Sequence, residues 1–366
     1  MKGRALIVTP LYLPLLGGME RQVALLAAEL GAMGYEVDVL TEHADRSSPR
    51  HEQTEAARVT RVRTTSDRGP LTYPLVVAGM VAFLLRNRRR YRFAVVRTLT
   101  LPAVVVGLLK RLRVLPYPTL VTAETGGEHD DVMALRDYPA SGALRHLLAQ
   151  HDVLNGICLD NIVHYRQLGF PEGKLSRIHN GVETDGYAQR HFPERVRVFG
   201  FLGRLHREKG LHELLDAFAR LEPEARLVIA GEGEEEPALR AFVEQHDLSR
   251  RVKFAGRVPY EQLGDFFDGI DCLVLPSYSE GLPLSVLEAA AHKRPVVATD
   301  VSDLRELFGE NIFLCAKRDP EDLRRVMTEV MAPGALERVD YDAVIERLSI
   351  GHVARELEAR VLGTAR

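Results

Sequence analysis

Two glutamates eight residues apart lie where a predicted strand gives way to a predicted helix. Glu280 is in the turn after the apolar run 271–276, and Glu288 is in the body of the helix that follows. A second apolar run at 294–300 completes a strand–helix–strand unit, in which ligands bind at the carboxyl ends of the strands. Two carboxylates at this spacing can hydrogen-bond a polyhydroxylated ligand at two points. The alternative is an ordinary loop glutamate and a solvated helix glutamate.

The start of the helix between these glutamates is suited to bind a phosphate or a sugar hydroxyl. Pro283 fits the first helical turn, where a missing N–H costs nothing. The backbone amides near Leu284 and Ser285 then face the mouth of the sheet and can donate to an anion.

Two basic residues form a second candidate group, in the segment 203–210. Arg204 follows the predicted strand 197–203 and Lys209 precedes the predicted helix 211–221, so both cations can converge on the same cleft. Fixed cations and helix amides stabilise negative charge on a leaving group without a metal. Ordinary surface charge remains the alternative for either residue taken singly.

Composition describes a globular chain that is long enough for two domains. The 366 residues are 46% hydrophobic and 27% charged, and the net charge of −3 argues against a general nucleic-acid binder. The three cysteines have no paired metal-type spacing, so we expect buried free thiols. The apolar N-terminal run is too short for a signal peptide, and no stretch approaches the ~20 apolar residues that span a bilayer. We therefore expect a cytoplasmic protein.

Short apolar strands alternate with helices in both halves of the chain. Predicted strands lie at 5–9, 36–41, 93–97 and 119–123, and again at 197–203, 226–231, 251–256, 271–276 and 294–300. This alternation predicts an α/β fold with parallel, doubly wound sheets. The charged stretch 189–195 marks the expected domain border, and 341–361 is expected to form one long helix.

The E-x7-E segment, the 203–210 segment and Asn180-Gly181-Val182 resemble the retaining glycosyltransferases of family 4, and the resemblance extends over nearly the whole chain. It implies the GT-B fold, with two Rossmann-like domains facing a central cleft. Residues 1–190 would form the acceptor-side domain and 191–345 the nucleotide-sugar domain. Residues 346–366 would form a helix that returns to the first domain.

The resemblance also implies a part for individual residues. Glu280 would meet the donor sugar and Glu288 the nucleotide ribose, while Arg204 and Lys209 would stabilise the departing nucleoside diphosphate. Further donor-binding positions are Gly17, Gly18, Gly203, Gly231, Gly233, Arg257, Val258, Gly281, Leu282, Leu284 and Ser285.

The chain departs from the family on the acceptor side. The family usually has a histidine at the strand end where this chain has Glu124 and Thr125, and His129 follows a few residues later. We expect Glu124, Thr125 and His129 to bind the acceptor, or else to form a solvated loop. A metal site at 128–130 is disfavoured because adjacent residues do not present a tetrahedral or octahedral set.

A second departure concerns glycine. The family commonly has Gly at the position of Lys293 and Gly-Gly at Ser302 and Asp303. The loop that borders the sugar is therefore expected to differ, which bears on the choice of sugar.

The implied reaction is transfer of a hexosyl group, with retention and without a metal or other cofactor, from UDP-glucose or UDP-N-acetylglucosamine to an acceptor hydroxyl. A sugar-nucleotide epimerase of the same fold and a non-catalytic glycan- or partner-binding module remain alternatives. The basic cluster at 86–92 beside the apolar stretch 73–85 is either a core helix with cations at its end or a peripheral contact with the inner membrane face.

Overall fold

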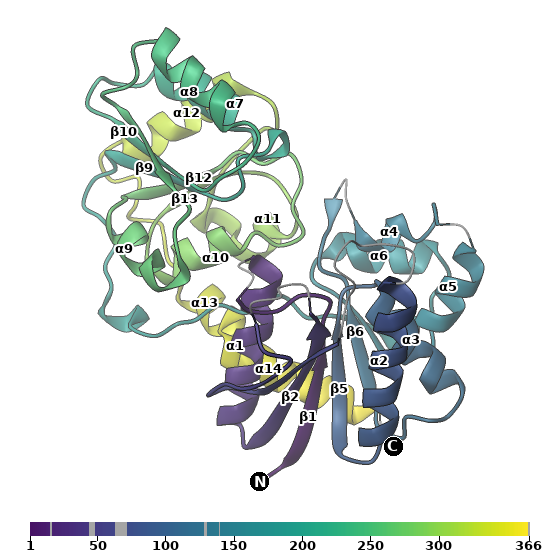
Figure 1. The fold of residues 1–366 in the computed structure, drawn as a ribbon. Helices are drawn as coiled ribbons and strands as arrows, with labels where there is room; N and C mark the ends of the chain where they lie inside the picture. Colours follow the sequence, from purple (N-terminus) through teal and green to yellow (C-terminus); the bar gives the residue numbers. More distant parts are fainter. Residues whose placement is uncertain (15–16, 44–47, 63–71, 128–129, 139, 365–366) are drawn as a thin grey trace. The chain divides into compact units, whose positions relative to one another are not determined.

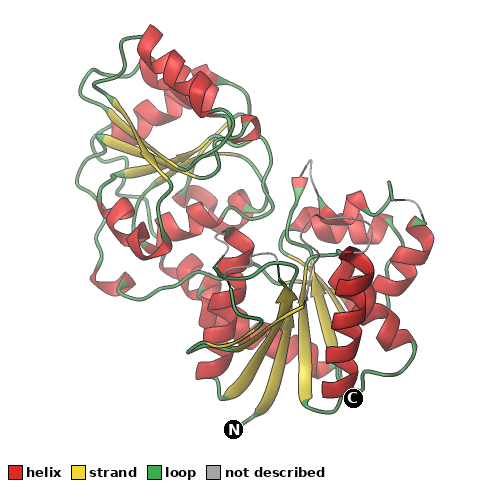
Figure 2. Cartoon of the chain, in the orientation of Figure 1, coloured by secondary structure: helices red, strands yellow, loops and turns green. Residues whose placement is uncertain are grey.

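The computed structural model describes residues 1–14, 17–43, 48–62, 72–127, 130–138 and 140–364. They form two compact units. Unit 1 is Met1–Gly181 together with Ile350–Arg366, and unit 2 is Val182–Ser349. The chain thus passes between the units at 181–182 and at 349–350, whereas the sequence places the boundaries at 190–191 and 345–346. Each unit contains a largely parallel sheet with helices on both faces (Figures 1 and 2).

The sheet of unit 1 has the order β3-β4-β2-β1-β5-β6-β7-β8 within the described residues. The strands are β1 Gly3–Val8, β2 Tyr35–Glu42, β3 His51–Gln53, β4 Arg58–Val62, β5 Tyr91–Arg97, β6 Thr119–Thr122, β7 Val153–Gly156 and β8 Leu175–Arg177. Neighbouring strands are parallel except for the antiparallel pair β3 and β4. β4 is not the edge of the sheet, because β3 pairs with its outer side. The central strands are continuous apolar runs because both faces are covered.

Helices cover the two faces of this sheet from different parts of the chain. The helices of unit 1 are α1 Gly18–Ala32, α2 Thr72–Asn87, α3 Leu101–Arg111, α4 Asp131–Ala134, α5 Ser141–Leu148, α6 Leu159–Gln167 and α14 Ile350–Gly363. On one face, Met80 and Val106 pack with Val8 and Val96 in one apolar cluster. On the other face α1 and α14 lie together (Figure 1), and Leu30 and Leu357 belong to a second cluster.

Unit 2 also contains a sheet covered by helices. Its six described strands have the order β11-β10-β9-β12-β13-β14, and all neighbouring strands among them are parallel. The strands are β9 Val198–Leu202, β10 Arg226–Ala230, β11 Val252–Gly256, β12 Cys272–Leu275, β13 Val296–Thr299 and β14 Phe313–Cys315. The helices are α7 Leu211–Ala219, α8 Glu236–Gln245, α9 Leu263–Asp268, α10 Leu284–Ala291, α11 Leu304–Phe308, α12 Pro320–Met331 and α13 Asp342–Leu348.

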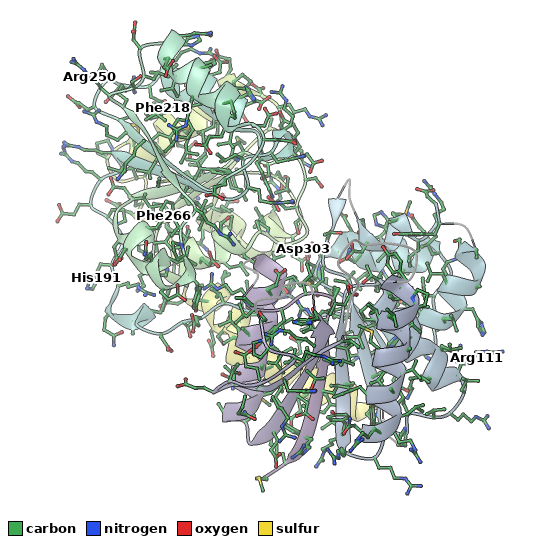
Figure 3. All side chains as sticks on the ribbon, in the orientation of Figure 1. Arg111, His191, Phe218, Arg250, Phe266 and Asp303 are labelled. Atoms are coloured by element: carbon green, nitrogen blue, oxygen red, sulfur yellow. The ribbon has the colours of Figure 1, made fainter. Side chains whose placement is uncertain are left out.

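Helices α7, α8 and α12 lie on one face of the unit 2 sheet, and α9 and α10 lie on the other (Figure 1). Phe218 of α7 and Phe266 of α9 are buried between helix and sheet, while Arg250 in the turn before β11 points outward (Figure 3). The cysteines Cys158, Cys272 and Cys315 are free and buried, which confirms the expectation from the sequence.

The helix expected over 341–361 is two helices. Ser349 separates α13 from α14 and has an extended ψ of 140°. The carbonyl of Leu348 accepts a hydrogen bond from the amide of Val182, at 2.9 Å. Val182 and Ser349 also form an isolated parallel bridge. Because this carbonyl is bonded to another segment, the helical pattern is interrupted where the chain leaves unit 2.

Each sheet changes direction of winding at one pair of adjacent strands. In unit 1 this point lies between β1 and β5, and in unit 2 between β9 and β12. Loops diverge at the carboxyl ends of such a pair and leave a crevice in which ligands bind.

Candidate functional site

Lys209 and Glu280 meet at the switch point of unit 2. Lys209 ends the short 3-10 helix η4 (Arg207–Lys209) that follows β9, and Glu280 lies in the loop after β12. Lys209 Nζ lies 2.5 Å from Glu280 Oε1, and the side chains are 17% and 13% exposed. The two residues come from different loops, 71 positions apart. The structure therefore brings together one member of each group that the sequence singled out.

Backbone contacts hold these two loops against each other. The Tyr278 amide donates to the carbonyl of Glu208 at 2.8 Å. Gly210 has a φ of +67°, and a β-carbon there would overlap the carbonyl of Pro276. Glycine is therefore required both by the left-handed conformation and by the close approach. As a result, η4 and the loop of Glu280 form one rigid edge.

Hydroxyl groups on β13 and in the loop after it fix the loop of Glu280 on its other side. Thr299 Oγ1 donates to the carbonyl of Ser277 at 2.5 Å, and the Ser302 hydroxyl donates to the carbonyl of Gly281. Gly281 is half-buried and Leu282 is 5% exposed, so the segment that follows Glu280 packs into the domain.

The first turn of α10 leaves backbone donors at this edge. Val286 and Leu287 donate to the carbonyl of Pro283, the residue that caps the helix. The preceding amides, of Leu284 and Ser285, donate to no group in the described part of the chain. Amides at a helix N-terminus bind anions. Glu288 lies one turn further on and is 7% exposed.

Arg204 leaves β9 at the same edge and is exposed. No ion pair joins it to Glu280 or to any other acid in the described ranges. The structure therefore brings Lys209 and Glu280 into contact, whereas Arg204 follows the same strand end without an ion pair to either.

The remaining glycine positions of unit 2 shape the adjacent loop. Gly231 follows β10 with a φ of +137°, and a β-carbon there would overlap the carbonyl of Gly203. A β-carbon at Gly233 would likewise overlap the carbonyl of Leu205. The loops after β9 and β10 are thus packed backbone to backbone. Arg257 follows β11 and is exposed, and Val258 is half-buried.

Two of the departures from the family pattern fall on left-handed backbone. Lys293 has a φ of 51° and Ser302 a φ of 55°. Glycine adopts this region without steric cost, whereas other residues do so with strain. The Lys293 ammonium lies 4.6 Å from the centre of the Tyr187 ring. Both positions therefore keep the backbone of a glycine while adding a side chain that makes a new contact.

In unit 1 the corresponding edge carries a buried ion pair. Glu124 lies just after β6, and Arg97 is the last residue of β5. Arg97 Nε is 2.5 Å from Glu124 Oε1, and Nη2 donates to Oε2 at 2.6 Å. The same Nη2 donates to Asn180 Oδ1 at 3.1 Å. Burial raises the pKa of Glu124 to about 7, although the Arg97 cation acts to lower it.

The loop after Glu124 is fixed by Asp131. Its carboxylate accepts from the amides of Glu124 and Thr125 and from the Thr125 hydroxyl, at 2.7, 3.2 and 2.7 Å. Thr125 itself is exposed. His129 and its neighbour Glu128 lie outside the described residues. Asp130 is buried and accepts from Asn161 Nδ2 at 2.7 Å.

Gly17 and Gly18 lie at the start of α1 and are exposed. A β-carbon at Gly17 would overlap the carboxylate of Glu20, which is 7% exposed. Further along α1, the Gln22 side chain both donates to the Gly181 carbonyl and accepts from its amide, at 2.7 and 3.1 Å. The two glycines and the Asn180–Gly181 segment are thus part of the same edge of unit 1.

Sequence reasoning did not select Arg97 or Gln22. The signal for Arg97 was a charged residue at the end of an otherwise apolar strand, in a strand that neighbours the switch point. Gln22 offered no signal, because a polar residue in an amphipathic helix is common.

The described residues contain no group of three or more His, Cys, Asp or Glu side chains arranged to hold a metal ion. No described helix is long and apolar enough to cross a membrane.

Comparison with known proteins is consistent with this geometry in both units. Residues 17–181 match the model of the glycosyl transferase 4-like domain, and residues 186–341 match that of glycosyl transferases group 1. The protein is thus a glycosyltransferase of the GT-B fold. More narrowly, the chain belongs to family 4 of these enzymes.

Two relatives illustrate the extent of the similarity. A glycosyltransferase of Bacillus subtilis (strain 168) assigned to teichuronic acid biosynthesis is 36% identical over 146 residues, which are 39% of this chain and 36% of that protein. The glycogen synthase of Mycobacterium tuberculosis (strain CDC 1551 / Oshkosh) is 27% identical over 92% of this chain and 88% of its own.

Two solved structures share the fold. Sucrose-phosphate synthase from Thermosynechococcus elongatus superposes with a TM-score of 0.76 and 21% identity, over 97% of both chains. Anabaena Alr3699/HepE in complex with UDP superposes with a TM-score of 0.73 and 19% identity, over 97% of this chain and 98% of that one.

Proposed function

We propose that this glycosyltransferase moves a hexosyl group, with retention, from a nucleoside diphosphate sugar to an acceptor hydroxyl. The observation that carries the proposal is the Lys209–Glu280 pair at the switch point of unit 2, beside the amides that begin α10. A cation and helix amides suit a diphosphate, while a carboxylate suits sugar hydroxyls.

Each side chain has one task in this proposal. Glu280 accepts hydrogen bonds from the hydroxyls of the donor sugar. Lys209 and the exposed Arg204 stabilise the charge that develops on the diphosphate, and Glu288 binds the ribose. The contact between Lys209 and Glu280 keeps both side chains in place before the donor arrives, so binding costs less conformational entropy.

The reaction breaks the bond between the anomeric carbon and the diphosphate oxygen, and its electron pair leaves with the diphosphate. The acceptor oxygen forms the new bond from the same face of an oxocarbenium-like sugar. Its proton passes to an oxygen of the departing phosphate. Arg204 and Lys209 supply the charge stabilisation that this step requires, without a metal.

The donor is proposed to be UDP-glucose or UDP-N-acetylglucosamine. A structure of the same fold contains UDP, which supports uridine as the base. The acceptor is a hydroxyl on a small molecule, a lipid-linked sugar or a polysaccharide, bound by unit 1 through Glu124, Thr125 and His129.

Nucleotide binding to the full chain tests the donor side. We expect UDP to raise the melting temperature of the wild type, and Lys209→Met to remove most of that increase. Lys253→Met is the matched control, because Lys253 is an exposed lysine on β11. Absence of stabilisation by UDP, GDP and ADP alike would overturn the proposal.

Product analysis separates the alternatives. A transferase forms a glycoside or releases free sugar together with UDP, and NMR shows that the anomeric configuration is retained. A sugar-nucleotide epimerase releases an altered sugar without any acceptor. A binding module leaves UDP-sugars intact, and its cellular function survives Glu280→Ala.

We also propose a peripheral membrane contact through α2 and α3. Leu75 and Leu85 on α2 and Leu108 on α3 are exposed, and the exposed arginines Arg88 and Arg89 follow α2 directly. Basic side chains beside exposed apolar ones attract anionic headgroups. Cosedimentation with vesicles that contain 30% phosphatidylglycerol, but not with pure phosphatidylcholine vesicles, is the expected result. Equal binding to both would contradict the proposal.

A further inference from the structure

The Arg97–Glu124 pair is almost completely enclosed at the edge of unit 1 where ligands of parallel sheets bind. The side chains are 7% and 8% exposed, less than either member of the Lys209–Glu280 pair. Arg97 Nη2 donates a hydrogen bond to Glu124 Oε2. Arg97 Nε lies 2.5 Å from Glu124 Oε1 but not in hydrogen-bonding geometry, so the buried Oε1 has no hydrogen-bond partner among the described residues.

The surroundings of Glu124 also fix its backbone. Asp131 accepts a hydrogen bond from the Glu124 amide, and Asn180 orients Arg97 from the other side. The charged and titratable groups that face Glu124 are Arg97 on β5, Asp131 on α4 and Glu20 on α1, together with the buried hydroxyl of Tyr165 on α6. Burial and the neighbouring carboxylates of Asp131 and Glu20 raise the pKa of Glu124, and the Arg97 cation acts against them.

Stability alone is a weak explanation for such a pair. Desolvation of two charges offsets much of their attraction, and an apolar pair of similar volume is often at least as stable. Yet the pair occupies strand ends beside the switch point of unit 1, where ligands of parallel sheets bind. Buried charged groups that cost desolvation energy are characteristic of binding and catalytic sites. Glu124 Oε1 is a buried acceptor whose hydrogen-bonding capacity is unused by the described residues.

We propose that Glu124 binds and orients the attacking hydroxyl, and that Arg97 is the positioning residue that fixes its carboxylate. The inference rests on the proposed function. The ionised carboxylate accepts the hydrogen bond of the acceptor hydroxyl, and the proton still leaves with the departing phosphate. The pKa of Glu124 is raised to about 7. The ionised carboxylate is therefore present above neutral pH and is lost as the pH falls.

Donor hydrolysis tests this without knowledge of the acceptor, because water then takes the place of the acceptor hydroxyl. The probe is the UDP-sugar that the wild type turns over. For Glu124→Gln we expect kcat for hydrolysis to fall at least tenfold, with KM for the donor and stabilisation by UDP unchanged. The wild-type rate should rise with pH around a midpoint near 7, whereas the Glu124→Gln profile should be flat over that range.

Arg97 is tested by its effect on the pH profile. Removal of a neighbouring cation raises the pKa of a carboxyl, so Arg97→Met should move the midpoint of the hydrolysis rate to higher pH. Arg97→Lys keeps the positive charge but loses the planar guanidinium, and it should move this midpoint less. A merely structural residue would change stability without moving this midpoint.

The double variant Arg97→Met/Glu124→Leu removes both charges and is expected to fold while hydrolysing slowly. Asp152→Asn is the matched control, because Asp152 is a paired carboxylate at the opposite end of the same sheet, 2.7 Å from Lys110. It should hydrolyse the donor at the wild-type rate.

The two proposals fail in different ways. A folded Glu124→Gln enzyme with wild-type kcat and an unchanged pH profile overturns the inference and leaves the transferase assignment intact. A wild type that is not stabilised by any nucleotide and turns over no UDP- or GDP-sugar overturns both.

Discussion

The two sheet edges use the same architecture to hold charge in different ways. In unit 2, Lys209 and Glu280 come from loops, are partly exposed and lie beside helix amides that have no partner among the described residues. In unit 1, Arg97 and Glu124 come from strand ends and are enclosed. The first arrangement suits a charged ligand that must enter and leave. The second suits a fixed contact with a neutral hydroxyl.

The largest effect is expected when a substitution breaks the Lys209–Glu280 pair of unit 2. Glu280→Gln should lower kcat for donor turnover by about 10²–10³-fold, a typical loss when one preorganised electrostatic contact to the reacting group is removed. Steady-state kinetics with UDP-sugars measure this.

The double variant Glu280→Gln/Lys209→Met sharpens the comparison. If the two residues act as a unit, the double variant should be scarcely slower than the slower single variant. Strictly multiplicative losses would show that the residues act independently.

Gly210→Ala tests the rigid edge that carries this pair. The left-handed backbone and the overlap with the Pro276 carbonyl should destabilise unit 2 by about 2–4 kcal/mol. Urea unfolding measures the loss. Gly264→Ala is the control, because Gly264 lies in α9 with open space around its β-position and should gain up to about 1 kcal/mol.

Acid should act on unit 1 through His151. This side chain is fully buried, its Nε2 is 3.0 Å from the Ala103 carbonyl, and burial lowers its pKa to about 4 from 6.5. A depressed pKa of a base gives stability above pH 6.5 that is lost as the pH falls toward 4. The loss should reach about 2 kcal/mol at pH 5.

Denaturant unfolding at pH 7 and pH 5 measures this loss, and His151→Gln should reduce it. An equal decrease in wild type and variant would assign the acid sensitivity to other groups.

Ser302 is expected to give the smallest effect. Ser302→Ala loses the hydrogen bond to Gly281 and keeps the left-handed strain, whereas Ser302→Gly loses the bond and relieves the strain. The glycine variant should therefore be more stable by about 1 kcal/mol. Both should raise KM for the donor by the same few-fold factor, since both release the loop of Glu280. Equal melting temperatures would contradict the strain argument.

Contiguous sequence patterns made much of the fold predictable, together with the edge of unit 2 that carries Lys209 and Glu280. Strands such as β1 and β12 are buried on both faces and therefore read as apolar runs. The segments around Lys209 and Glu280 contain glycines and charged residues together, and each follows such a run directly. Their contact follows because β9 and β12 are neighbours in the sheet, and the βα loops of a parallel sheet open on the same edge.

The features that were missed depend on distant segments. Arg97 and Glu124 are 27 positions apart, and nothing local to either shows that they pair. Strand β3 is polar and forms because β4 offers an unpaired edge. The interruption at Ser349 depends on a hydrogen bond from Val182. These outcomes are decided by tertiary contacts, which local propensity does not contain.

The interruption at Ser349 has a consequence for protein production. Gly181 and Ile350 lie next to each other in unit 1, and Val182 and Ser349 form a bridge in unit 2. Each unit thus has two neighbouring chain ends at the crossing, and unit 2 is an insertion whose removal leaves a continuous polypeptide. A gene that joins codon 181 to codon 350 encodes all of unit 1, and codons 182 to 349 encode unit 2, so each unit can be encoded as a separate polypeptide.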